Sequence, residues 1–374
     1  MSDRTAVTLL TGFLGAGKTT LLNNLLSDPL GGRIAVIVNE FGEAGLDHDL
    51  IESTAEDVIL MASGCICCTI RSDLARTLGD LYDRRSRGEL AFDRVVIETT
   101  GLADPGPVHH TLMLEPEVSR NFRLDGIVTV VDMVLGTVTL DRHAEAQAQV
   151  AMADRIVLTK TDLASDGQAD ILQRRLDQIN PRALRIRASM GRVASGCLFD
   201  LDQGRSGDSA AAVEWLGMVA SPDPLAGLSG FGTASKATAL PGFPSTAPHH
   251  AQGGSICTAS IFIDTPIPAP VFDFWLDMLI GIQGNTILRL KAIIHIEDAQ
   301  CPFVLHGVQH ILEQPVPLKT WPAGDFTSRV VLIARDSSVE QLTAHLEMLR
   351  LRPDPSRINY VVDSGPELPF KADI

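Results

Sequence analysis

Short apolar runs alternate with amphipathic segments through the first half of the chain. The runs fall at residues 6–10, 34–38, 58–61, 94–97, 127–131 and 155–158. None of them alternates apolar with polar positions, which is typical of strands covered on both faces. One helix is predicted to begin at Lys18, where leucines form an apolar stripe, and another spans residues 72–86. This order predicts an α/β fold, a doubly wound and mostly parallel sheet within residues 1–199.

The amino-acid composition changes twice in the second half of the chain. Gly, Ser, Ala and Pro dominate residues 200–254, which predicts a flexible linker with one helical fragment at residues 213–219. His249 and His250 lie in this linker, and the sequence gives them no definite role. A second, smaller α+β domain is predicted over residues 255–352, followed by a tail over residues 353–374.

The second domain is expected to be an antiparallel sheet with two helices against one face. Its strands are predicted at residues 255–264, 287–294, 303–308 and 330–334, and its helices begin near Pro270 and Ser338. Polar residues alternate more in these strands than in the first half, which favours a sheet with one solvated face.

Composition excludes several classes of protein. A formal net charge of −15 argues against nucleic acid as a partner, because phosphate backbones require clustered Lys and Arg. No apolar run approaches the length of a membrane span, and the acidic N-terminus is unlike a signal peptide. Six cysteines in 374 residues do not form a disulfide framework, so reduced thiols and a cytoplasmic location are expected. The oligomeric state, including a homo-oligomer, stays open.

The segment VTLLTGFLGAGKTTLL contains the pattern G-x-x-x-x-G-K-[ST], with Gly12, Gly17, Lys18 and Thr19 at its fixed positions. A buried strand precedes the glycine-rich loop and a helix follows it, so backbone N–H groups and the helix N-terminus would face phosphate oxygens. The phosphate-binding loop (P-loop) is predicted to consist of Gly12, Gly15, Ala16, Gly17, Lys18, Thr19 and Thr20. The dinucleotide fingerprint G-x-G-x-x-G is excluded, because Thr20 occupies the position of its third glycine.

Two further elements complete a nucleotide site. The strand at residues 94–97 runs into Glu98 and Gly101, with the spacing of the D-x-x-G element, so Glu98 and Thr19 would hold Mg²⁺ and Gly101 would sense the γ-phosphate. Asp132 is a weaker candidate for a supporting role. Residues Thr159, Lys160 and Asp162 resemble the N-K-x-D element with Thr for Asn, which favours GTP over ATP. Ala188 and Ser189 give a faint signal for a last base contact.

Three cysteines, Cys65, Cys67 and Cys68, crowd into the stretch GCICCT. Thiolates at this spacing suit Zn²⁺ or Co²⁺ better than Mg²⁺ or Ca²⁺, and a following helix would lower their pKa values. Three ligands leave a coordination position open for exchange. Candidates for a fourth ligand are Glu43, His109 and His110, and the sequence does not choose between them. The remaining cysteines are isolated and are interpreted as core or surface residues.

Taken in order, TLLTGFLGAGKTTLL, VNEFGE, GCICC, ETTGLADPGPV and ADRIVLTKTD resemble the CobW family of P-loop GTPases. The likeness covers residues 5–190, and LHGVQ at residues 305–309 resembles the family's C-terminal domain more loosely. The resemblance implies hydrolysis of GTP coupled to delivery of a metal, often zinc, to a client metalloprotein. The histidine-rich tract of many members is absent, which puts metal storage in doubt.

A mechanism follows if residues 39–43 and 64–69 lie in loops beside the P-loop, at the edge of the sheet where ligands bind. GTP and Mg²⁺ would order these loops and tighten the metal site, and hydrolysis would loosen it. One alternative is a P-loop kinase. Such an enzyme would need an acceptor pocket with a catalytic base, and the sequence shows none. Others are a nucleotide-gated scaffold with incidental metal binding and an insertase for cobalt or another metal.

Overall fold

The computed structural model describes residues 4–28, 31–39, 59–62, 70–202, 209–216, 256–283, 286–319, 321 and 325–352. Seven parallel strands form the first sheet, in the order β3-β2-β4-β1-β5-β6-β7. They are β1 Thr5–Gly12, β2 Ile34–Asn39, β3 Ile59–Ala62, β4 Arg94–Thr99, β5 Phe122–Asp132, β6 Arg155–Thr159 and β7 Leu184–Arg187. All of them present their carboxyl ends at one edge, where ligands of such sheets bind.

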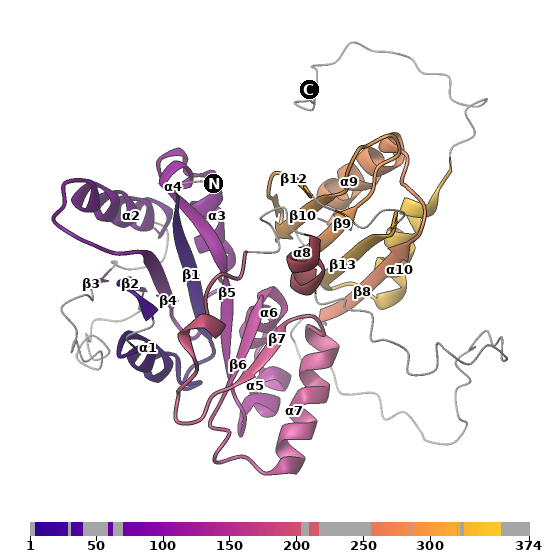
Figure 1. Cartoon of the computed structure of the whole chain (residues 1–374). Helices are drawn as coiled ribbons and strands as arrows, with labels where there is room; N and C mark the ends of the chain where they lie inside the picture. Colours follow the sequence, from indigo (N-terminus) through magenta and orange to yellow (C-terminus); the bar gives the residue numbers. More distant parts are fainter. Residues whose placement is uncertain are drawn as a thin grey trace.

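Seven helices accompany this sheet in the described residues (Figure 1). They are α1 Lys18–Leu26, α2 Ile70–Ser86, α3 Gly106–Leu114, α4 Pro116–Asn121, α5 Gly136–Arg142, α6 Ala144–Met152 and α7 Asp166–Ile179. Leucines of α1 pack on one face of the sheet together with Leu198, Phe199 and Leu201. Apolar residues of α2 to α7 cover the other face. Strands β1, β4, β5 and β6 are therefore buried on both faces, as their continuous apolar runs predict, whereas β7 at the edge is exposed or half-buried.

The second sheet is antiparallel, in the order β11-β10-β9-β13-β8, with β12 paired to β10. Its strands are β8 Ile256–Ile263, β9 Ile287–Ile294, β10 Phe303–Val308, β11 Ile311–Leu312, β12 Val316–Pro317 and β13 Ser328–Arg335. Helices α9 Ala269–Gln283 and α10 Val339–Glu347 pack on one face, where Trp275 is fully buried. The α/β class with a second, smaller α+β domain is confirmed.

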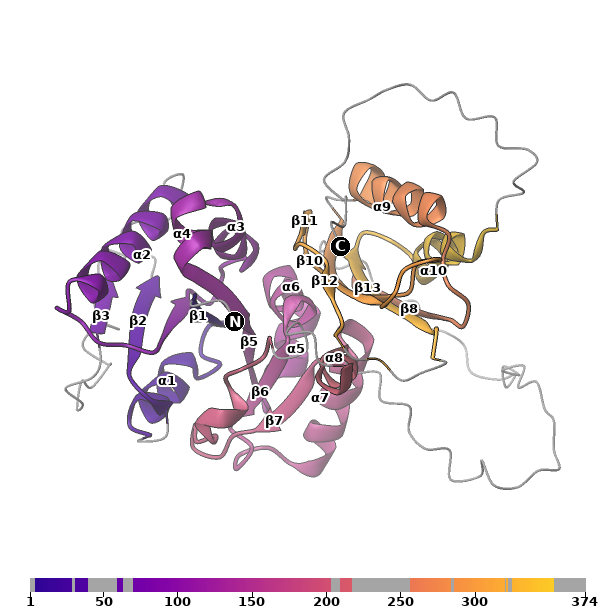
Figure 2. The same ribbon diagram turned by 45° about the horizontal axis from the view of Figure 1, so that its top comes forward.

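The other face of the second sheet is also covered, which the sequence analysis did not predict. Helix α8 Ser209–Leu216 packs there against Ile293 and Val331, while Leu288, Val308 and Ile333 join the core of the first domain. Figure 2 shows α8 and α6 on this side of the sheet. Strand β9 is therefore buried along its whole length, whereas edge strand β8 alternates and exposes Ser260 and Phe262, so the expected solvated face is confined to that edge.

Other expectations also need correction. The helical fragment predicted at residues 213–219 lies at residues 209–216. Strand β7 was missed because its sequence LRIR is short and charged. Strands β2 and β3 are not beside the P-loop strand, because β4 lies between β1 and β2, and β3 lies beyond β2. Among the residues that the structure describes, no helix is long and apolar enough to span a membrane.

Candidate functional site

The P-loop follows β1 at the carboxyl edge of the sheet. Gly12 has φ 143°, and a Cβ there would lie 2.3 Å from the Val130 carbonyl oxygen of β5, so a side chain cannot be accommodated. Gly17 is the N-cap of α1 in the left-handed conformation, with φ 96°. The two glycines thus let the loop pass close to β5 and then turn sharply into the helix, leaving the first N–H groups of α1 available for an anion.

Lys18 is held inside this loop. Its ammonium donates to the carbonyl oxygens of Gly12 (2.9 Å) and Phe13 (3.4 Å), and the residue is only 9% exposed. An ammonium group held inside a glycine-rich loop at a helix N-terminus is suited to bind polyphosphate oxygens through charge-assisted hydrogen bonds.

Thr19 and Glu98 meet across two elements, as the sequence predicts for a magnesium site. The Thr19 hydroxyl donates to a Glu98 carboxylate oxygen at 3.1 Å, and Glu98 is 6% exposed. Glu98 reaches this point because β4 pairs directly with β1, with Leu10 opposite Glu98. A hydroxyl and a carboxylate side by side are the hard oxygen donors that Mg²⁺ prefers, so these residues fit that ion.

Gly101 packs directly on the P-loop. A Cβ at this position would lie 2.5 Å from the backbone nitrogen of Leu14, so only glycine allows the contact. Gln149 of α6 donates its side-chain amide to the carbonyl oxygens of Gly101 and Ala103, each at 3.1 Å. Sequence reasoning missed Gln149; the only signal was a polar residue on an otherwise apolar helix face.

The T-K-x-D segment is tied to the P-loop by two contacts. The Thr159 hydroxyl donates to the Ala16 carbonyl oxygen at 2.6 Å, and the Lys160 ammonium donates to the Gly15 carbonyl oxygen at 2.8 Å. Lys160 also pairs with Asp132 at 2.5 Å, so Asp132 lies beside the lysine of this segment. Lys160 has φ 54°, a left-handed conformation that aims its side chain back across the loop.

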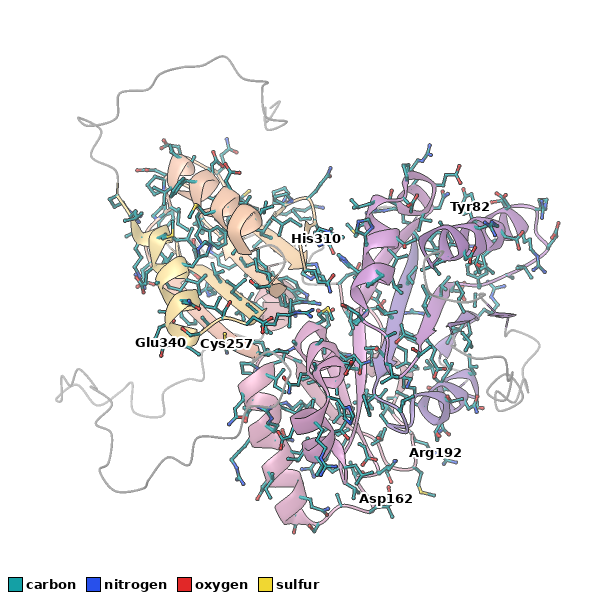
Figure 3. The ribbon with its side chains drawn as sticks, turned by 180° about the vertical axis from the view of Figure 1, so that it is seen from behind. Tyr82, Asp162, Arg192, Cys257, His310 and Glu340 are labelled. Carbon is teal, nitrogen blue, oxygen red and sulfur yellow. The ribbon has the colours of Figure 1, made fainter. Side chains whose placement is uncertain are left out.

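Asp162 lies beyond these contacts and is exposed, as Figure 3 shows at the lower edge of the first domain. The preceding Thr161 donates its hydroxyl to the Ala188 carbonyl oxygen at 2.9 Å, which brings the loop after β7 beside this segment. Ala188 is fully buried, whereas Ser189 is exposed. The structure therefore places Asp162 and Ser189 on the surface near the same loop.

The predicted metal ligands Cys65, Cys67, Cys68 and Glu43 lie outside the described residues, as do His249 and His250. His109 and His110 belong to α3; His109 is fully buried, and its Nε2 lies 3.6 Å from Glu313 of the second domain. Within the described parts of the chain, no group of three His, Cys, Asp or Glu side chains could hold a metal ion. The cysteines described there, Cys197, Cys257 and Cys301, are free thiols.

Comparisons with known proteins agree with this arrangement. The model of the CobW/HypB/UreG nucleotide-binding domain matches residues 6–187, and the model of the cobalamin synthesis protein cobW C-terminal domain matches residues 256–350. The crystal structure of Zn(II)-bound YjiA GTPase from E. coli superimposes with a TM-score of 0.67 and 29% identity, covering 93% of this chain and 100% of that one.

Two curated relatives match over part of their length. The chain is 46% identical over 195 residues to the zinc chaperone YjiA of Escherichia coli, covering 52% of this chain and 61% of YjiA. It is 35% identical over 221 residues to the zinc-regulated GTPase metalloprotein activator 1 of Schizosaccharomyces pombe, covering 57% of this chain and 53% of that protein. The aligned segments thus span between half and two thirds of these relatives.

Proposed function

The chain belongs to the CobW/HypB/UreG family, and from that premise we propose that it hydrolyses GTP and uses the cycle to deliver zinc to a client metalloprotein. The observation that carries the proposal is the pair of contacts from Thr159 and Lys160 to the P-loop. These contacts support the proposal that residues 159–162 read guanine, because they hold this segment beside residues 15 and 16. The similarity to a zinc chaperone and to a zinc-regulated GTPase supports the choice of metal.

Nucleotide binding uses both sides of the site. The triphosphate lies along the N–H groups of residues 12–20, where Lys18 exchanges its bonds to the Gly12 and Phe13 carbonyls for phosphate oxygens. The aliphatic part of Lys160, fixed at its end by Gly15 and Asp132, covers the base. The Asp162 carboxylate accepts from N1–H and the exocyclic amine of guanine, a pair of donors that adenine lacks.

Hydrolysis requires stabilisation of the charge that develops on the transferred phosphoryl group. Lys18 neutralises part of that charge in a buried setting, where electrostatic interactions are stronger than in water. Thr19 and Glu98 would hold Mg²⁺, which would neutralise negative charge on the phosphates. The Gly101 N–H would bind the γ-phosphate, and its close packing on Leu14 places that group beside the loop.

The cargo is bound by Cys65, Cys67 and Cys68, with Glu43 as the proposed fourth ligand. Soft thiolates select Zn²⁺ or Co²⁺ over Mg²⁺, and three thiolates with one exchangeable ligand allow transfer to a client. The γ-phosphate would tighten this site, and hydrolysis would release the metal.

A metal titration in three nucleotide states tests the proposal. Zn²⁺ affinity is measured by competition with a chromophoric chelator, with GDP, with a non-hydrolysable GTP analogue plus Mg²⁺, and with no nucleotide. We expect tighter binding with the analogue by roughly 5- to 150-fold, the usual size of a coupling between two sites. By reciprocity, Zn²⁺ must raise affinity for the analogue by the same factor.

The control replaces Cys67 and Cys68 with Ser. This variant should lose the coupling and still bind nucleotide, because the sulfurs would contact the metal and not the phosphates. Equal Zn²⁺ affinity in all three states would instead favour a nucleotide-gated scaffold with incidental metal binding. Tighter coupling with Co²⁺ than with Zn²⁺ would identify a cobalt insertase.

A further inference from the structure

Two sets of polar contacts are among those that join the domains. The first, called here the anchor, consists of Asp154 of the first domain with Arg289 and Lys291 of β9. Their side chains are at most 6% exposed, and Arg289 also donates to the Met152 carbonyl oxygen at 2.6 Å. Paired charges that are buried in this way are costly to separate, so the anchor should hold the domains together more firmly than an exposed contact would.

The second contact, called here the clamp, joins Asp104 to Gln309. The Gln309 amide donates to both oxygens of the Asp104 carboxylate, at 2.9 and 3.1 Å. Asp104 lies three residues after Gly101, in the loop that leads into α3, and it also accepts from the Gly106 backbone N–H at 2.8 Å. The clamp is exposed to solvent, so it breaks and re-forms far more easily than the anchor.

Local geometry shows that the clamp is closely fitted. Gln309 lies in the turn between β10 and β11 with φ 54°, a conformation rare for a residue other than glycine. Gly106 faces it, and a Cβ on Gly106 would lie 2.2 Å from the Gln309 side-chain oxygen. A methyl group at residue 106 would therefore displace the Gln309 carboxamide while leaving both backbones in place.

The same hairpin contacts α3 farther along. Glu313 follows β11, and one of its carboxylate oxygens lies 2.7 Å from His306 Nδ1 and 3.6 Å from His109 Nε2. The rings of His110 and His310 lie 5.9 Å apart. Figure 3 shows His310 on the side of the second domain that faces the first. The hairpin thus contacts α3 at several points, all of them C-terminal to Gly101.

We propose that Gln309 is a positioning residue for GTP hydrolysis, supplied by the second domain, which holds the Gly101 loop in place through Asp104. The inference rests on the proposed function. Gln149 of the first domain contacts Gly101 directly, whereas Gln309 of the second domain contacts Asp104, three residues farther along the same loop. Any movement of the β10–β11 hairpin, such as docking of a client, would reach the γ-phosphate sensor by this route.

The test compares steady-state GTP hydrolysis of the full-length protein with that of three variants. Gln309→Ala removes the donor from the second domain. Gly106→Ala displaces the same donor from the first domain, at a helical position where Ala has the higher intrinsic propensity, and its melting temperature is measured to separate this effect from a loss of stability. His310→Ala changes the neighbouring residue of the same turn and leaves the Asp104–Gln309 contact intact.

We expect Gln309→Ala and Gly106→Ala to lower kcat by roughly 5- to 10-fold, less than the roughly 10- to 150-fold for a hydrogen bond to a charged group, because this contact is exposed to solvent. The KM for GTP and the affinity for GDP should stay unchanged, because the clamp reaches only the γ-phosphate sensor. His310→Ala should hydrolyse GTP like the wild type. In a double-mutant cycle, Gln309→Ala should add nothing once Asp104 is Ala.

Three results would contradict either the role of Gln309 or the proposed function. Wild-type kcat in both Gln309→Ala and Gly106→Ala would overturn the inference while leaving the proposed GTPase intact. Additive effects of the Asp104 and Gln309 substitutions would overturn it too. A wild-type protein that does not hydrolyse GTP would overturn the proposed function itself.

Discussion

The phosphate half and the base half of the site are built in different ways. Lys18 and Glu98 are nearly inaccessible to solvent: Lys18 donates to Gly12 at the end of β1, and Glu98, near the end of β4, accepts from Thr19 of α1. In the base half, the Lys160 side chain is 37% exposed and Asp162 is a surface residue. The buried half has its geometry before nucleotide arrives, whereas the exposed half needs the base to complete it. The rate of hydrolysis should therefore depend on the phosphate half, and the selectivity between nucleotides should depend on the base half.

The largest effect is expected from Lys18→Ala in the phosphate half. Removing the ammonium leaves the transferred phosphoryl group without its main compensating charge, and kcat should fall by about 10³-fold. Hydrolysis is measured by phosphate release at saturating GTP, and the melting temperature serves as the control for folding. Turnover near that of the wild type would contradict the P-loop assignment.

Asp162→Asn tests the base half. Loss of a charge-assisted hydrogen bond to guanine should weaken GTP binding by roughly 10- to 100-fold, with kcat at saturation close to normal. Xanthosine triphosphate should bind the variant better than the wild type, because its C2 carbonyl needs a donor in place of an acceptor.

A matched control for that variant is Asp166→Asn, which removes an exposed carboxylate from the first turn of α7. It should leave GTP affinity unchanged. Nucleotide affinities are measured by calorimetry for GTP, xanthosine triphosphate and ATP. If the wild type bound ATP as tightly as GTP, Thr159 to Asp162 would have no role in base selection.

The smallest effect is expected from Asp132→Asn, at the border of the two halves. The Asn oxygen can keep accepting from the Val134 and Leu135 N–H groups, but its amide would face the Lys160 ammonium, donor against donor. The lysine stem loses its anchor, so GTP affinity should fall by about 3- to 10-fold without a change in kcat. A fall in kcat with unchanged affinity would instead place Asp132 in the phosphate half.

Much of the site could be predicted because its parts are local. The glycines of the P-loop, the Glu98 strand end and the T-K-x-D segment each follow a strand, and parallel strands present their carboxyl ends at one edge. The order of the strands within the sheet could not be predicted from these local patterns. Strand β4 pairs with both β1 and β2, so Glu98 lies beside Thr19. The same pairing separates the ends of β2 and β3 from the P-loop.

The sequence by itself determined the phosphate loop, because the backbone angles at Gly12 and Gly17 and the chemistry of Lys18 are set within eight residues. Only the tertiary structure decided what fixes Gly101. Gln149 contacts Gly101 from α6, and no residue near Gln149 in the sequence indicates this contact. Gln309 contacts Asp104, which lies 205 residues away in the sequence. The first contact arises from packing within the first domain and the second from packing of the second sheet against it, and no local sequence pattern encodes either relation.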